Sequence, residues 1–165
     1  MSPNKDNPEN AEASRFTASC NKAEEAALRL IARAEQNSLG LIAKLERKEF
    51  DTNVIKAVIS GLIERGLLND ERYAELWLRS RLAKKIQSPK SLLISLRKRG
   101  IDRNSAKKAL EKVLDEDAEY ALLLQYLEKL EKTPPSKAKK VPSQRAQLKY
   151  EGFSALSLDR YFEDF

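Results

Sequence analysis

The sequence predicts an all-α protein, built as an elongated tandem array of three three-helix repeats. Charged residues make up 34% of the chain, while Gly and Pro number only five and six, a composition typical of helical proteins. No stretch alternates Val, Ile or Thr with polar residues, so strands are not expected. A turn pattern that recurs along the chain gives the third observation and sets the size of the repeat.

The recurring pattern joins the second and third helix of each expected repeat. Residues 45–51 match residues 96–102, 51 positions later, and residues 148–154, a further 52 positions on. Each copy has a basic helix end, Gly or Glu, a bulky apolar residue, a capping residue and an amphipathic helix. Such repeats stack because one unit cannot bury its apolar face alone. We therefore expect a disordered tail and three repeats, at 1–20, 21–68, 69–116 and 117–165.

The first repeat follows a polar segment, residues 1–20, that lacks periodicity and is therefore expected to be disordered. A helix is predicted from Lys22 to Glu35. Ser38 is expected to cap the second helix, and Asp51 or Thr52 the third. The third helix carries the clearest amphipathic stripe of the chain, over residues 54–63.

The second repeat begins after Gly66, which suits the left-handed position that ends a helix. Leu67 and Leu68 are expected to plug a joint between helices. Asn69 or Asp70 then caps a helix over 70–85, in which Tyr73, Leu76 and Trp77 share one face. Trp77 is expected to anchor the core, because large aromatic residues are usually buried.

The remaining helices are delimited by caps and breakers. Ser88-Pro89 begins one helix, Gly100 ends it and Asp102 caps the next. A long helix is expected over 117–132, and then a loop at 133–142 that is rich in Pro and Lys. Two short helices complete the chain, the first of them beginning at Ser143.

Residue types that are missing from the sequence limit the possible chemistry. There is no His, and neither a P-loop nor a nucleophile motif is present. The acids at 115, 116, 117 and 119 lack the glycine pattern of a calcium loop, so we interpret them as favourable charges at a helix start. We expect no catalysis, no cofactor and no metal.

Cysteine content and the lengths of apolar runs indicate the cellular compartment. The single Cys20 fits a reducing compartment, and no apolar run approaches the length of a membrane span. Residues 1–20 also lack the apolar core of a signal peptide. A cytoplasmic protein without membrane contact is therefore expected.

Charge is arranged in blocks. The net charge is +6, but two windows, 76–101 and 132–150, contain no acid at all. Blocks of this kind favour a polyanion or an acidic protein surface as the partner, although a charge run can also be a solvated helix face. The candidate binding residues are the cations of these windows together with one from the joint: Arg72, Arg79, Arg81, Lys84, Lys85, Lys90, Arg97, Lys98, Arg99, Lys137, Lys139, Lys140, Arg145 and Lys149.

Residues 66–74, Gly-Leu-Leu-Asn-Asp-Glu-Arg-Tyr-Ala, resemble the most specific motif of the RecX family of regulatory proteins. Trp77, Arg81 and the run 96–101 lie at the family's usual places, and the resemblance covers about residues 24–165. There are two departures: Glu49 stands where the family usually has Gly, and Ser88-Pro89 replaces a Gly-containing joint.

The resemblance implies a non-enzymatic role. We also expect the chain to be a monomer. RecX proteins bind the RecA filament on single-stranded DNA, lie along its groove, and usually lower its ATPase, strand-exchange and co-protease activities. Some members also bind DNA directly. The resemblance therefore implies a role in RecA regulation, homologous recombination, DNA repair and the SOS response.

Two alternatives to a RecA regulator stay open from the residues. One is a basic helical module that binds DNA without RecA, and the other is a helical scaffold for another protein. Sequence-specific DNA reading is not expected, because aromatic residues are scarce in the basic windows. Arg72 also has two interpretations, as part of the basic face or as a structural residue that pairs with a nearby acid or covers the helix joint.

Overall fold

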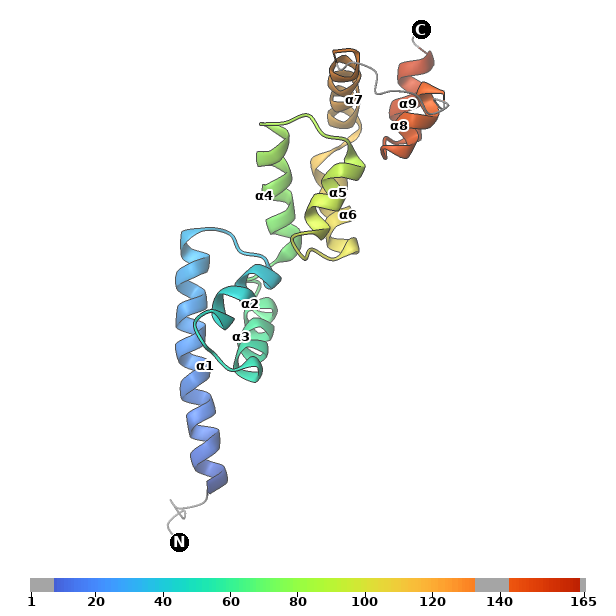
Figure 1. Ribbon diagram of the computed structural model, residues 1–165. Helices are drawn as coiled ribbons and strands as arrows, with labels where there is room; N and C mark the ends of the chain where they lie inside the picture. Colours follow the sequence, from blue (N-terminus) through green and yellow to red (C-terminus); the bar gives the residue numbers. More distant parts are fainter. Residues whose placement is uncertain (1–7, 133–142, 164–165) are drawn as a thin grey trace. The chain divides into compact units, whose positions relative to one another are not determined.

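The computed structural model describes residues 8–132 and 143–163, and these ranges contain nine helices and no strand (Figure 1). This confirms the all-α fold of three-helix repeats. The helices form three groups of three in chain order, which we call the first, second and third repeat. Their bounds are α1 Pro8–Arg33, α2 Ser38–Glu46, α3 Thr52–Glu64, α4 Asp70–Leu82, α5 Pro89–Arg97, α6 Arg103–Val113, α7 Glu116–Glu131, α8 Gln144–Tyr150 and α9 Ala155–Glu163.

The chain divides into two compact units, Met1–Tyr73 and Ala74–Phe165, with the division inside α4. In the first unit, α1 packs on both α2 and α3. The core of this unit takes small residues from α1 and large aliphatic residues from α2, α3 and the following joint. Its buried members are Ala23, Ala27, Leu41, Leu45, Val54, Ile55, Val58, Ile59, Leu62 and Leu68.

The second unit contains the second repeat from Ala74 onward and the third repeat, and these are joined by apolar and polar contacts. Leu82, Ile86 and Leu114 pack against the core of the third repeat. The Lys90 N–H donates to the Glu151 carbonyl at 3.0 Å, and the Ser88 hydroxyl donates to the Glu151 carboxylate at 2.6 Å. The turn between α8 and α9 is thereby fixed to the start of α5.

The recurring turn has the same backbone in all three repeats, as the sequence register predicted. Glu49, Gly100 and Gly152 have φ angles of 64°, 83° and 92°, the left-handed conformation that closes a helix. The backbone N–H of the next residue in each copy donates to the carbonyl oxygen of the last buried leucine of the helix. The three bonds are Phe50 to Leu45 at 3.4 Å, Ile101 to Leu96 at 3.2 Å and Phe153 to Leu148 at 3.3 Å. Each turn is therefore a Schellman motif.

The residue after each turn caps the third helix of its repeat. Asp51 accepts from the Asn53 N–H at 2.7 Å, and Asp102 accepts from the Asn104 N–H at 2.8 Å. Ser154 accepts from the Ser157 N–H at 3.2 Å. Glu49 occupies the same left-handed position as the two glycines, so the departure from the family pattern leaves the turn unchanged.

Several predicted boundaries were wrong. Residues 8–20 are helical and belong to α1, whereas residues 1–7 lie outside the described part. Pro8 is tolerated at the first helical position, and Glu9 lies where the helix dipole favours an acid. The N-cap of α2 is Asn37 rather than Ser38, and α4 ends at Leu82 rather than Lys85. The predicted loop at 133–142 lies outside the described residues.

The buried face of α4 also differs from the prediction. Ala74 and Leu78 are fully buried, whereas Leu76 is 50% exposed and Trp77 is half-buried. A small residue and a leucine four positions apart form the packing face, and Trp77 lies at its edge. Trp77 is therefore partly accessible rather than a core anchor.

Candidate protein and nucleic-acid interface

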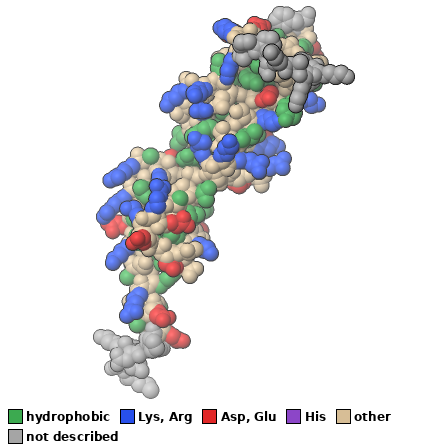
Figure 2. Space-filling view, viewed as in Figure 1, with side chains coloured by type: hydrophobic (Ala, Val, Ile, Leu, Met, Phe, Trp, Pro, Cys, Tyr) green, Lys and Arg blue, Asp and Glu red, His purple; other side chains and the backbone are tan. Residues whose placement is uncertain are grey.

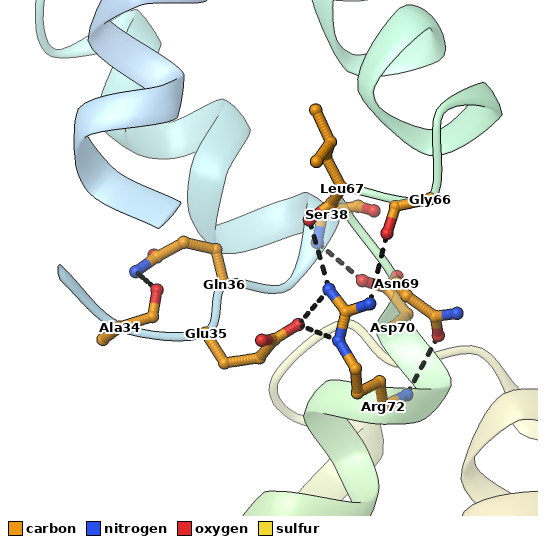
Figure 3. A network of polar contacts seen from close by, with 9 residues as sticks. All are labelled: Ala34, Glu35, Gln36, Ser38, Gly66, Leu67, Asn69, Asp70 and Arg72. Carbon is orange, nitrogen blue, oxygen red and sulfur yellow. Dashed lines mark hydrogen bonds and ion pairs between the residues drawn. The ribbon is translucent and has the colours of Figure 1, made fainter. Parts of the chain in front are cut away.

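Arg72 lies at the centre of the joint between the first and second repeats, within the first unit (Figure 3). Its Nε and one terminal nitrogen contact the same Glu35 carboxylate oxygen at 2.8 and 2.7 Å. Its two terminal nitrogens also donate to the Gly66 carbonyl at 3.1 Å and the Leu67 carbonyl at 3.2 Å. The guanidinium satisfies carbonyls at the end of α3, so the geometry favours the structural role for Arg72.

The other residues of this motif also build the joint. The Asn69 side chain accepts from the Arg72 N–H at 2.9 Å and caps α4. Asp70 accepts from the Ser38 N–H at 2.7 Å and thereby satisfies the start of α2. Leu68 is 2% exposed and plugs the joint as predicted, but Leu67 is 38% exposed. The motif therefore fixes the helix connections, and the binding surface must be sought elsewhere.

Trp77 is flanked by two arginines of the second unit. The Arg99 guanidinium carbon lies 4.5 Å from the centroid of the Trp77 ring, and that of Arg81 lies 5.9 Å away. Arg81 is half-buried and its Nε donates to Gln87, whereas Arg99 is exposed and donates to the Ser95 carbonyl at 3.1 Å. Attraction between cation and ring holds both arginines beside the aromatic face.

Most other cations of the first acid-free window are exposed. Figure 2 shows Lys and Arg side chains gathered over the region of α4, α5 and α6, with hydrophobic patches between them. Within the described ranges, none of the following has a recorded ion pair: Arg79, Lys84, Lys85, Arg97, Lys98 and Lys149. Their charge is available to an external anion.

The remaining candidate residues do not form one continuous surface with these. The Lys90 ammonium lies 3.1 Å from the centroid of the Tyr150 ring, at the contact between the second and third repeats. Arg145 pairs with Asp159 and lies 5.6 Å from the Phe162 ring centroid. Lys137, Lys139 and Lys140 lie outside the described residues.

The acids at the start of α7 have structural roles. Asp115 caps the helix by accepting from the Ala118 N–H at 2.9 Å, and Asp117 pairs with Arg160 at 3.0 Å. Glu119 accepts from the Ser154 N–H at 2.9 Å and the Ser157 hydroxyl at 2.8 Å, so it supports the start of α9. In the described part of the chain, no group of three or more Cys, Asp or Glu residues is arranged to hold a metal ion.

The pKa values of Asp102 and Tyr126, both in the second unit, depart from their ordinary values. Hydrogen bonds from Ser105, first from its side chain and then from its backbone, lower the pKa of Asp102 below its ordinary 3.8. Burial, and then the negative charge of Glu151, raise the pKa of Tyr126 above its ordinary 10.0. The Tyr126 ring lies 5.5 Å from the Phe153 ring, so this phenol belongs to the core of the third repeat.

A hollow of about 1040 Å³ on the second unit was not predicted from the sequence. It lies along α5 and α6 and reaches the turn before α9. Arg97 and Lys90, which are predicted parts of the basic face, line it together with Arg103 and Lys107. A smaller hollow occurs at the equivalent positions of the first repeat.

The family model described as the second three-helix domain of RecX matches residues 69–110, which contain α4, α5 and most of α6. Regulatory protein RecX of Treponema pallidum is 36% identical over 115 residues, which cover 70% of each chain. The chain belongs to the RecX family. Regulatory protein RecX of Halorhodospira halophila is 40% identical over 101 residues, 61% of this chain and 59% of that one.

Solved RecX structures have the same fold. The crystal structure of RecX from Lactobacillus salivarius has a TM-score of 0.63 and 24% identity, and the match covers 90% of this chain and 97% of that one. A second RecX crystal structure has a TM-score of 0.67 and 18% identity, covering 100% and 81%. Among the described residues of this RecX-family chain, no helix has the length and apolar character needed to cross a membrane.

Proposed function

We propose that this RecX-family chain binds the RecA filament on single-stranded DNA and lowers its recombinase, ATPase and co-protease activities. It acts in the cytoplasm, without catalysis of its own, in the regulation of homologous recombination, DNA repair and the SOS response. The relatives in the family are named regulatory proteins, which supports a role exerted through a partner.

The observation that carries the proposal is the set of exposed cations in the acid-free stretch 76–101, which runs from within α4 to the turn after α5. Arg79, Lys84, Lys85 and Lys98 are exposed and have no recorded ion pair within residues 8–132 and 143–163. Unpaired cations attract a polyanion without losing existing contacts. A protein-coated DNA strand offers phosphates and acidic side chains over a long distance, so it matches a block of charge better than a small ligand does.

The proposed mechanism is binding without chemistry. Cations on the second unit attach to the filament, and the bound chain then blocks addition of further RecA subunits or promotes their loss. Because counterions are released when phosphates are neutralised, the phosphate-dependent share of the affinity falls steeply with salt. A purely apolar contact would lose little affinity under the same change.

The test is the rate of ATP hydrolysis by RecA on single-stranded DNA, titrated with this chain. The variant is Arg79→Glu/Lys85→Glu/Lys98→Glu, which leaves the half-buried Arg81 in place. Its matched control is Arg15→Glu/Lys22→Glu/Arg33→Glu on α1, where the three side chains are also exposed. Each set replaces three cations by anions, so each lowers the net charge from +6 to 0.

We expect the wild-type chain and the α1 variant to inhibit ATP hydrolysis similarly. The Arg79→Glu/Lys85→Glu/Lys98→Glu variant should need an at least about tenfold higher concentration for the same inhibition, since several charge contacts are reversed together. Equal inhibition by both variants would reject this surface. Circular dichroism of both variants checks that helicity is retained.

A second candidate function is DNA binding without RecA, favoured by Trp77 with Arg81 and Arg99 beside it. Aromatic rings and arginines together bind single strands with little sequence preference. Because Trp77 is the only tryptophan, quenching of its fluorescence by oligo-dT measures this contact directly. Quenching by the bare strand at physiological salt would favour this function over filament binding.

A further inference from the structure

The hollow on the second unit has an apolar floor and charged ends, and we call it the α5–α6 groove. Its floor is built from α5, α6 and the start of α9. Ile94 and Leu156 are 45% and 64% exposed, so the floor is accessible to a partner. The apolar lining residues are Leu93, Ile94, Ala106, Leu110, Leu114 and Leu156.

The same groove exists in the first unit, between α2 and α3, with a volume of about 410 Å³. Each of its lining residues lies 51 positions before a residue that lines the α5–α6 groove. The groove is therefore a property of the repeat rather than an accident of one surface. The apolar pairs are Ile42 with Leu93, Ile55 with Ala106, Ile59 with Leu110 and Ile63 with Leu114.

The two ends of the α5–α6 groove carry opposite charge. Arg97 ends α5 and Arg103 begins α6, so both lie at the turn that connects the helices. Asp115 and Glu116 lie beyond the other end of α6 and also line the groove. The cation at that end, Lys90, has its ammonium over the Tyr150 ring. An apolar floor with a basic end and an acidic end complements an amphipathic helix that has acids in its first turn and cations in its last.

The groove of the first unit lacks this charge pattern. Glu46 stands at the position of Arg97, and Thr52 stands at the position of Arg103. The end that is basic in the second unit therefore carries an acid in the first. Apolar surface is common to both grooves, but only the α5–α6 groove attracts an acidic helix start.

We propose that the α5–α6 groove docks one amphipathic helix of a RecA subunit, with its acidic first turn at Arg97 and Arg103. This inference rests on the proposed function, because the filament supplies the partner. The apolar face of the docked helix covers Ile94 and Leu156, and its last turn lies near Asp115 and Glu116. The cations of α4 then act separately, on the phosphates or acidic side chains of the filament.

The test measures affinity for a preformed RecA filament on immobilised single-stranded DNA. Ile94→Glu places a charge on the groove floor, and Arg97→Glu gives the groove the residue found at Glu46 of the first repeat. Ile63→Glu is the matched control, because Ile63 is 50% exposed and lines the other groove. All three changed residues are exposed, so the fold is expected to persist, as circular dichroism would verify.

Ile94→Glu and Arg97→Glu are each expected to weaken filament binding about tenfold, the effect of losing one anchor contact. Ile63→Glu should stay within about twofold of the wild type. If the wild type binds the filament and Ile94→Glu binds equally well, the groove proposal fails while the proposed function stands. A wild type that does not bind the filament overturns both.

Sedimentation equilibrium of the chain alone tests whether a second copy of this chain occupies the α5–α6 groove instead. The proposal expects a monomer, with or without Ile94→Glu. A wild-type dimer that Ile94→Glu dissociates would assign the groove to a second copy of this chain and would overturn docking of a RecA helix.

Discussion

The first and second repeats share one backbone plan and carry different surfaces. Leu45 and Leu96 are both fully buried before the turn, and Asp51 and Asp102 both cap the following helix. Between these matched positions, Glu46 in the first repeat corresponds to Arg97 in the second. The comparison teaches that a few buried, turn and cap positions specify the repeat, and that the remaining positions are free to adapt each copy to a partner.

The buried leucine should have the largest effect. Leu96→Ala is expected to lower the free energy of unfolding of the second unit by about 2–5 kcal/mol, because it removes apolar contacts and leaves a cavity. Leu45→Ala should have a similar effect in the first unit. Urea denaturation followed by circular dichroism measures both. A loss of less than about 1 kcal/mol at one site would mean that the two repeats are not equivalent there.

Substitutions at the left-handed position of the turn should change the stability of the first and second repeats in opposite directions. Gly100→Ala places a Cβ at a φ of 83° and should destabilise by about 1–2 kcal/mol. Glu49→Gly relieves the same strain at a φ of 64°, and should stabilise by roughly 0.5–1 kcal/mol after the greater flexibility of the unfolded glycine is subtracted. Thermal unfolding of the two variants compares them directly. Destabilisation by Glu49→Gly would contradict the assignment of one turn to both repeats.

Removing the cap residue Asp102 should change the free energy of unfolding by a smaller amount, and that amount should depend on pH. Asp102→Ala is expected to lower the free energy of unfolding by about 1 kcal/mol at pH 7. Hydrogen bonds lower the pKa of Asp102 in the folded state below its ordinary 3.8. The stabilisation that the ionised Asp102 gives to the folded chain is therefore fully present above pH 3.8, and it is lost as the pH falls through the lower pKa of the folded state. The free energies of unfolding of wild type and Asp102→Ala should therefore converge at acidic pH. A difference that persists unchanged at low pH would show that the carboxylate charge does not support the cap.

Much of the fold could be predicted because local signals agree with one another. Gly66, Gly100, Ser88-Pro89 and Asp102 have the roles that their residue types suggest, and the spacing of 51 and 52 residues gave the register of the turns. The face of α4 could not be predicted, because Ala74 is fully buried where larger residues seemed better candidates. Packing at a close helix contact selects a small residue, and hydrophobicity alone does not indicate this.

The candidate site was harder to predict than the fold. Charge counts identified the exposed cations of the stretch 76–101, but they did not separate them from Arg72, which the joint uses, or Arg145, which pairs with Asp159. Those pairings depend on residues distant in the sequence. The α5–α6 groove was missed because its lining comes from three repeat elements that only the folded chain brings together.

We propose that RecA on single-stranded DNA is the partner, and a binding comparison can test this proposal. Binding of this chain to RecA-coated and bare single strands is compared by fluorescence anisotropy at about 50 and 200 mM salt. We expect at least about tenfold tighter binding to the coated strand at both salt concentrations. Equal affinity for the bare strand, or binding to neither strand, would contradict it.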